Sequence, residues 1–367
     1  MKPLSIEGTL STTDKTKKFS LISSGNYPYV CARVRARRAL LLSRDVYSKL
    51  LMMDIHQITR FLGESRYKKE ITELGIKYAG LELTEIALNR NMSEVYHQIL
   101  GYCDGDLYTM LSAYLQREDV WNIKTILRGK FYNATPEEIM KTIRAAGRYP
   151  EDYWKKIVQT SKTVGEVIDN LEGNEYYQTL KALGEDCSAN LTECENRLEI
   201  AYYDFLLGAI PPNSEPNKLF LSFVRKEIGL LNLKTLLMTK FENVEPDKIN
   251  KMLIVGGEIP EKEMQVLTKA PNFEQFLEGL QKLSYYEMIR DDIKTIEETG
   301  SLSNVIRILE KDFFTKATKS SYLYPLSIMP ILDYLIRKKI EIENLRILAR
   351  GKDRGLSEQT LKGLLVM

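Results

Sequence analysis

The chain has few of the residues that usually hold metal ions. Its 367 residues include only two histidines, His56 and His97, and four cysteines with no Cys-x-x-Cys pair among them. Zinc sites are usually built from such pairs together with histidines, so we expect no metal site and no cofactor. Isolated cysteines also predict reduced thiols of the cytosolic kind. The cysteines are Cys31, Cys103, Cys187 and Cys194.

Long apolar runs and an excess of one charge are also missing. The most apolar stretch, LYPLSIMPIL at 323–332, is short and twice interrupted by proline, whereas a membrane-spanning helix needs about 20 apolar residues. Lys and Arg number 52 against 50 Asp and Glu, a net charge of +2 without the basic excess typical of nucleic-acid-binding proteins. We therefore expect a chain that neither crosses a membrane by itself nor binds nucleic acid.

Motifs for catalysis are absent as well. The sequence contains no GxxxxGK[ST] phosphate loop, no HExxH and no GxSxG, and no GxGxxG follows a predicted strand. The acidic pairs at 137–138, 291–292 and 297–298 lie at predicted helix starts or on polar faces, where carboxylates are solvated. We expect no catalytic residue and no small-molecule substrate.

What the sequence does contain is a nine-residue segment present in three versions: NIKTILRGK at 122–130, NLKTLLMTK at 232–240 and NLRILARGK at 344–352. In each version apolar residues recur at i, i+3 and i+4, which is typical of one helix face. Asparagine is a mediocre helix former, so its recurrence predicts a side-chain hydrogen bond to the end of a neighbouring helix. The recurring basic residues are interpreted as a solvated face and a helix C-terminal charge. They are Lys124, Lys234 and Arg346, and Lys130, Lys240 and Lys352.

Two other markers share this period of about 110. Thr135-Pro-Glu-Glu, just after the first segment, predicts a helix that begins with a capping box, and weaker helix starts follow the other two. A Leu/Tyr marker recurs every 109 residues, at Leu62, Leu171 and Leu280 and at Tyr67, Tyr176 and Tyr285.

Strand signals are scarce, and the period is too long for solenoid repeats of about 33 to 47 residues. The sequence therefore predicts an all-α chain built from three similar tandem helical domains. The expected boundaries are a flexible N-terminal arm at 1–25 and modules at 26–149, 150–259 and 260–367.

Four arginines lie within six residues at Arg33, Arg35, Arg37 and Arg38. One interpretation is a solvated helix whose arginines cover apolar surface with their own stems. The other is a partner interface that contacts acidic protein or membrane head groups. The residues themselves leave both open, and the interface is the prediction carried forward.

These arginines belong to NYPYVCARVRARRALLLSRDVYSKLL at 26–51. The N-Y-P-Y opening, the A-R-V-R that follows, the L-L-S-x-x-x-Y at 41–47 and the three nine-residue segments make the sequence recognisable. Over 26–367 it resembles the C subunits of archaeal A-type ATP synthases, a family related to the d subunits of eukaryotic V-type ATPases.

The resemblance implies a pseudo-threefold funnel of three helical domains that is a non-catalytic component of the central stalk, or rotor. Such a socket links the membrane proteolipid ring to the D and F subunits of the central stalk. It transmits torque to or from the catalytic A and B subunits, in ion-driven ATP synthesis or ATP-driven ion pumping. The implied location is peripheral, on the cytoplasmic side of the cell membrane. The alternative from the residues alone is a cytosolic all-helical repeat scaffold that binds peptides or helices.

Overall fold

Helices account for all of the regular structure that the computed structural model describes, which covers residues 25–184 and 186–366. No strand occurs within these ranges, so the all-α prediction is confirmed there. The predicted arm at 1–25 lies outside the described residues except for Gly25.

The helices follow one another with short connections. The first are α1 (Tyr27–Arg38), α2 (Arg44–Leu51), α3 (Ile55–Gly63), α4 (Lys68–Leu74), α5 (Gly80–Leu100) and α6 (Gly105–Leu115). Next come α7 (Arg117–Phe131), α8 (Pro136–Thr142), α9 (Glu151–Thr160), α10 (Val164–Asn170), α11 (Tyr177–Leu183), α12 (Asp186–Ala189) and α13 (Leu191–Ala209). The last are α14 (Glu215–Phe241), α15 (Pro246–Met252), α16 (Glu261–Lys269), α17 (Phe273–Leu280), α18 (Tyr286–Thr299), α19 (Ser303–Leu323), α20 (Met329–Asp353) and α21 (Glu358–Leu364).

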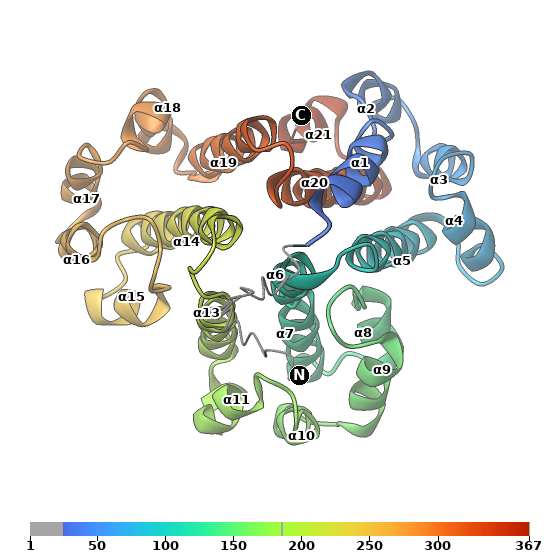
Figure 1. Ribbon diagram of the computed structural model, residues 1–367, viewed down its shortest axis with the longest axis horizontal. Coiled ribbons are helices and arrows are strands. Elements are labelled where there is room, and N and C mark those ends of the chain that lie inside the picture. Colours follow the sequence, from blue (N-terminus) through green and yellow to red (C-terminus); the bar gives the residue numbers. More distant parts are fainter. Residues whose placement is uncertain (1–24, 185, 367) are drawn as a thin grey trace, which may run out of the picture.

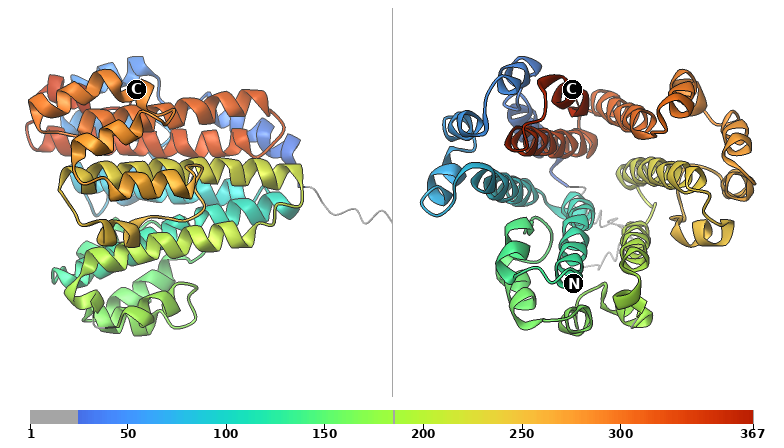
Figure 2. Two further views of the ribbon diagram at one scale, coloured as in Figure 1. Left: turned by 90° about the vertical axis from the view of Figure 1, so that its left-hand side faces the viewer. Right: turned by 180° about the vertical axis from the view of Figure 1, so that it is seen from behind.

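The helices gather in three groups around a common centre (Figure 1). One group contains α7 to α13, the second α14 to α19, and the third combines α20 and α21 with α1 to α5, while α6 contacts α5 of the third group and α7 and α13 of the first. The long helices α14, α19 and α20 run across the molecule in the side view (Figure 2, left), and α19 packs against both of the others. Because α20 contacts α1 and α5, and α21 contacts α2, the first and last of the described helices meet.

The second group has a core of its own. Leu233, Leu236 and Leu237 of the second nine-residue segment are fully buried against apolar side chains of α15 to α19, among them Ile249 and Phe276. Burying each such side chain stabilises the fold by about 1.5–3 kcal/mol. This core includes residues from 230 to 309 and so crosses the boundary expected after residue 259. The module boundaries remain a prediction.

The recurring asparagine makes the same pair of hydrogen bonds in all three places. Each donates from Nδ2 to the carbonyl of the residue 22 positions later and accepts that residue's N–H at Oδ1, at 2.8–3.0 Å. The partner lies two residues beyond the end of α8, α15 or α21, so the predicted bond to a neighbouring helix end is confirmed. The pairs are Asn122 with Arg144, Asn232 with Ile254, and Asn344 with Val366.

In two of the three nine-residue segments, the lysine that closes the segment does not lie in solvent as expected. Lys130 and Lys240 are buried, and both donate to backbone carbonyls. The ammonium of Lys130 donates to Val158 O at 2.8 Å, and that of Lys240 to Thr268 O at 2.5 Å and Ala270 O at 2.7 Å. Burial lowers the pKa of both amines. The solvated interpretation was wrong for these two because the lysine reaches the end of the second helix that follows its own, α9 for Lys130 and α16 for Lys240.

The Arg-Gly-Lys at two of the three segments has a packing role. A Cβ added to Gly129 would overlap with Ile139 of α8, and one added to Gly351 would overlap with Leu361 of α21. The glycine therefore lets a short helix lie close to a long one. The predicted capping box is confirmed at the start of α8, where Thr135 and Glu138 each bond the other's backbone.

Two cysteines are paired, contrary to the expectation of reduced thiols. Cys187 and Cys194 form a disulfide that ties α12 to α13, with their Cα atoms 5.4 Å apart. The seven-residue spacing gives no sign of pairing, but the chain turns at Asn190 and brings the two side chains together. Cys31 and Cys103 are free and buried.

Candidate functional site

The predicted arginine interface lies on α1, where the side chains make contacts within the chain. Arg33 lies over the rings of Tyr29 and Tyr102, at 4.9 and 4.8 Å from their centroids. Arg37 donates to Gln98 Oε1 at 2.7 Å and so holds α1 against α5. Arg33 keeps an exposed side chain, whereas Arg37 is half-buried.

The other two arginines hold α1 against the turn that joins α19 to α20. Arg35 donates to the carbonyl of Pro325 at 2.8 Å and remains exposed. Arg38 donates to Asp333 Oδ2 at 2.9 Å and to the Tyr322 hydroxyl at 2.8 Å. The cluster therefore supports the end of the molecule at which this turn lies. That it also contacts a partner stays a prediction.

A charged trio that the sequence pattern does not reveal lies where the three groups converge. Arg117, Glu227 and Lys339 each stand five residues before the asparagine of a nine-residue segment. Arg117 of α7 forms a two-pronged ion pair with Glu227 of α14, at 2.8 and 2.7 Å. Burial by itself would raise the pKa of Glu227, but Arg117 and, more weakly, Lys339 hold that pKa below its usual range.

Aromatic side chains enclose this ion pair. The Arg117 guanidinium lies 3.7 Å from the centroid of the Tyr114 ring and donates to the Tyr202 hydroxyl at 3.1 Å. All three charged residues line one cavity of about 170 Å³ between α7, α14 and α20. Extending the alignment of the three nine-residue segments by five residues towards the N-terminus would have aligned Arg117, Glu227 and Lys339. Because the three residue types differ, the sequence alone does not show that these positions correspond.

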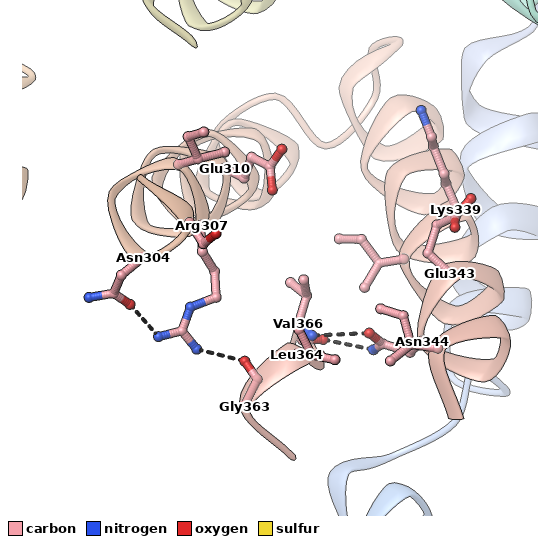
Figure 3. A pocket seen from close by; sticks show the side chains of 13 residues that line it. Asn304, Arg307, Glu310, Lys339, Glu343, Asn344, Gly363, Leu364 and Val366 are labelled. Carbon is pink, nitrogen blue, oxygen red and sulfur yellow. Dashed lines mark hydrogen bonds between the residues drawn. The ribbon is translucent and has the colours of Figure 1, made fainter. Parts of the chain in front are cut away.

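A larger cavity, of about 540 Å³, lies between α19, α20 and the end of α21 with Val366 beyond it. Figure 3 shows Asn344 bonded to Val366 in its wall, and Arg307 bonded to Asn304 and to the Gly363 carbonyl. The lining is largely apolar and includes no histidine or cysteine.

Helix α7 also carries a buried carboxylate, Asp119, which contacts the loop between α8 and α9. It accepts the backbone N–H of Arg148 at 2.7 Å and that of Tyr149 at 3.3 Å, and it is fully buried. Burial raises the pKa of Asp119 to about 7, against which the two backbone bonds and Arg148 act. A Cβ at Gly147 would overlap with this carboxylate. The loop can therefore lie this close to Asp119 only with glycine at position 147.

Replacing Asp119 with asparagine is expected to flatten the dependence of stability on pH. In the unfolded chain the carboxyl group of an aspartate has a pKa near 3.9. Between about pH 4 and 7, therefore, the Asp119 carboxyl group is protonated only in the folded chain. Stability therefore rises as pH falls through this window, by up to about 1.4 kcal/mol per unit. Urea unfolding of Asp119→Asn across the window should lose that slope, whereas Asp45→Asn, at an exposed carboxylate, should keep it. An unchanged slope in Asp119→Asn would contradict the assignment.

Residues 25–184 and 186–366 contain no group of three or more His, Cys, Asp or Glu side chains placed to hold a metal ion. Across the same part of the chain, no helix combines the length and the apolar character that a membrane span requires.

Comparison with known proteins identifies the family. The sequence profile described as ATP synthase (C/AC39) subunit matches residues 30–364. The C subunit of the A-type ATP synthase of Methanococcoides burtonii is 40% identical, over 96% of this chain and 98% of its own length. Those of Methanosarcina acetivorans and Archaeoglobus fulgidus are 39% and 33% identical, over 97% and 95% of this chain and 96% and 99% of their own lengths. The resemblance seen in the sequence is thereby confirmed, and the chain belongs to the ATP synthase (C/AC39) subunit family.

Proposed function

We propose that the chain is a non-catalytic rotor component of an A-type ATP synthase, a socket that joins the proteolipid ring to the D and F subunits of the shaft. The observation that carries the proposal is membership of the family over nearly the whole chain. Torque would pass through the socket to or from the catalytic A and B subunits. Its place would be at the cytoplasmic face of the cell membrane, held by these partners.

Repeated contacts support the threefold part of this proposal. The third residue of each nine-residue segment bonds a helix of its own group, linking α7 to α13, α14 to α19 and α20 to α5. The last link joins the C-terminal part of the chain to its N-terminal part, as a closed arrangement of three copies requires. We propose that the three modules form the pseudo-threefold funnel in this way. The pairs are Lys124 with Glu199, Lys234 with Glu310, and Arg346 with Asn89.

Ion pairs also join the groups to one another, as a torque-transmitting part requires. Arg117 and Glu227 join the first group to the second. Arg144, at the end of α8, contacts Glu343 of α20 at 3.3 Å. A hydrogen bond in place of an ion pair joins the second group to the third, where Asp333 of α20 accepts from Thr318 of α19 at 2.7 Å. Networks of partly buried ion pairs resist sliding of one helix group past another, because separation would leave charges unpaired.

An open helical scaffold, the alternative from the sequence, is less well supported. Solenoid repeats contact only their neighbours along the chain. Here Arg350 near the end of α20 pairs with Glu85 of α5, and Leu42 N–H donates to Glu341 at 2.7 Å. Contacts of this kind close the chain on itself.

Co-purification tests the proposed function. The tagged chain, expressed in cells that assemble the whole ATP synthase, would be extracted from membranes in mild detergent and recovered on the tag. We expect the proteolipid and the D and F subunits to elute with it in constant proportion. Recovery of the chain without these partners, under conditions that keep the A and B subunits bound to each other, would contradict the proposal.

A further inference from the structure

The turn between α19 and α20 exposes an unusual amount of apolar surface. Of residues 322–326, which comprise the last two residues of α19 and the first three after it, four carry large side chains that are about half exposed or more. Contiguous exposed apolar residues usually mark an interaction site rather than a packing defect. The exposed fractions are 67% for Tyr322, 63% for Leu323, 49% for Tyr324 and 61% for Leu326.

The turn is held in one conformation although its side chains are exposed. Arg35 donates to the carbonyl of Pro325, and the Cys31 thiol donates to that of Ser327 at 3.2 Å. The Ser327 hydroxyl donates to Tyr324 O at 2.7 Å. Surface side chains that are fixed before binding lose little conformational freedom when a partner arrives.

All charged side chains within the two segments that form and support the turn are basic. The helix α1 that supports it carries four arginines and no acidic residue, and the segment 319–328 carries one lysine and no acidic residue. The carboxylate in contact with this region, Asp333, is buried and is paired with Arg38 and Arg337. Arg33 and Arg35 keep exposed side chains beside the apolar residues.

The corresponding turns after α5 and α13 lack this surface. At 101–104 the tyrosine is half-buried and the cysteine buried, and at 210–214 the one large apolar side chain, Ile210, is buried. Connecting two long helices therefore does not require exposed tyrosine and leucine. The feature belongs to the third turn and calls for a role of its own.

We propose that the 322–326 turn, together with Arg33 and Arg35, is an anchor that inserts at the surface of a membrane containing anionic lipids. Tyrosine is enriched at the membrane–water boundary, leucine enters the acyl region, and arginine pairs with lipid phosphates. The supporting segments contain no acidic residue, so the partner is expected to be anionic. Anionic lipid head groups are favoured over an acidic helix of another protein, because such a helix would also need an apolar face to cover the turn. This anchor goes beyond the proposed socket, because it would act on lipid directly.

Vesicle flotation of the full chain tests the anchor apart from the ATP synthase. A single myristoyl chain binds membranes with a partition constant of about 10⁴ M⁻¹, and this smaller apolar surface should need about 1 mM accessible lipid. We expect binding to phosphatidylcholine vesicles that contain phosphatidylserine and none to phosphatidylcholine alone. Binding should weaken as salt is added.

Three variants separate the contributions. Leu323→Ser with Leu326→Ser should reduce binding at least about tenfold, because most of the inserted apolar surface is lost. Arg33→Gln with Arg35→Gln should reduce binding and its salt dependence together. The matched control, Val255→Ser with Val266→Ser, removes apolar side chains of similar exposure elsewhere on the chain and should bind as the unaltered chain does.

A second readout does not depend on loss of binding. A polarity-sensitive fluorophore on Leu326→Cys should shift to the blue on anionic vesicles, and one on Val255→Cys should not. Absence of binding by the unaltered chain, or binding that Leu323→Ser with Leu326→Ser leaves unchanged, would overturn the anchor. Retention by an isolated proteolipid ring without any vesicle binding would also overturn it and would assign the turn to protein contact.

Discussion

Replacing Arg117 with methionine is expected to lower the free energy of unfolding by about 3 kcal/mol. The substitution leaves Glu227 with no cation bonded to its carboxylate, in a site where its side chain is only 12% exposed. Removing one partner of a buried pair costs about 3–5 kcal/mol, and the 18% exposure of Arg117 places the expected loss at the lower end. Urea unfolding followed by circular dichroism measures the change.

The double variant Arg117→Met with Glu227→Leu is the control for this prediction. Because it removes both charges, it should recover at least about half of the lost stability. The remainder reflects the contacts of Arg117 with the Tyr114 ring and the Tyr202 hydroxyl, which the double variant also lacks. A double variant no more stable than Arg117→Met would show that packing, and not the ion pair, stabilises the junction between α7 and α14.

Replacing Asn232 with alanine is expected to cost about 2–4 kcal/mol. The change removes two buried hydrogen bonds and leaves the N–H and C=O of Ile254 without partners. A buried polar group without a partner costs about 1–3 kcal/mol. The unfolding midpoint reports the overall loss, and hydrogen exchange at the Ile254 amide should accelerate more than exchange in the first group.

Asn344→Ala provides a matched comparison, because Asn344 makes the same two bonds to Val366. Val366 is half-buried, so water can replace the lost bonds. We expect a loss of about 1 kcal/mol or less there. Equal losses at both positions would mean that the hydrogen bonds are not the source of the effect.

The sequence predicted the features that repeat with one period. Asn122, Asn232 and Asn344 are unfavourable within helices, and their recurrence indicated a shared bond that the structure contains. The Thr135 cap and the all-helical class rest on local patterns as well. Short-range spacing carries this information because helix formation and capping involve residues only a few positions apart.

Features that depend on distant contacts were missed. Lys130 resembles a helix C-terminal charge, and only the position of Val158, 28 residues later, explains its burial. Arg117 and Glu227 differ in charge although they occupy matching places, so no repeat was visible at their position. The identity of such residues depends on the side chains that they contact in other helix groups. Local spacing in the sequence carries no information about those contacts.

The arginines of α1 lie between these two cases. Their density suggested a surface that contacts a partner, and the structure uses Arg35 and Arg38 to support the turn at 322–326. A contact with a partner would therefore depend on them partly through the turn that they hold in place.

Cross-linking within the assembled complex tests the rotor assignment most directly. A bismaleimide link from an introduced surface cysteine of this chain to the D protein of the shaft would fix two parts that are proposed to turn together. A link to a stator protein would fix a turning part to a stationary one. We predict that the first link leaves ATP hydrolysis unchanged and that the second abolishes it. Full hydrolysis with the chain linked to the stator would contradict the account.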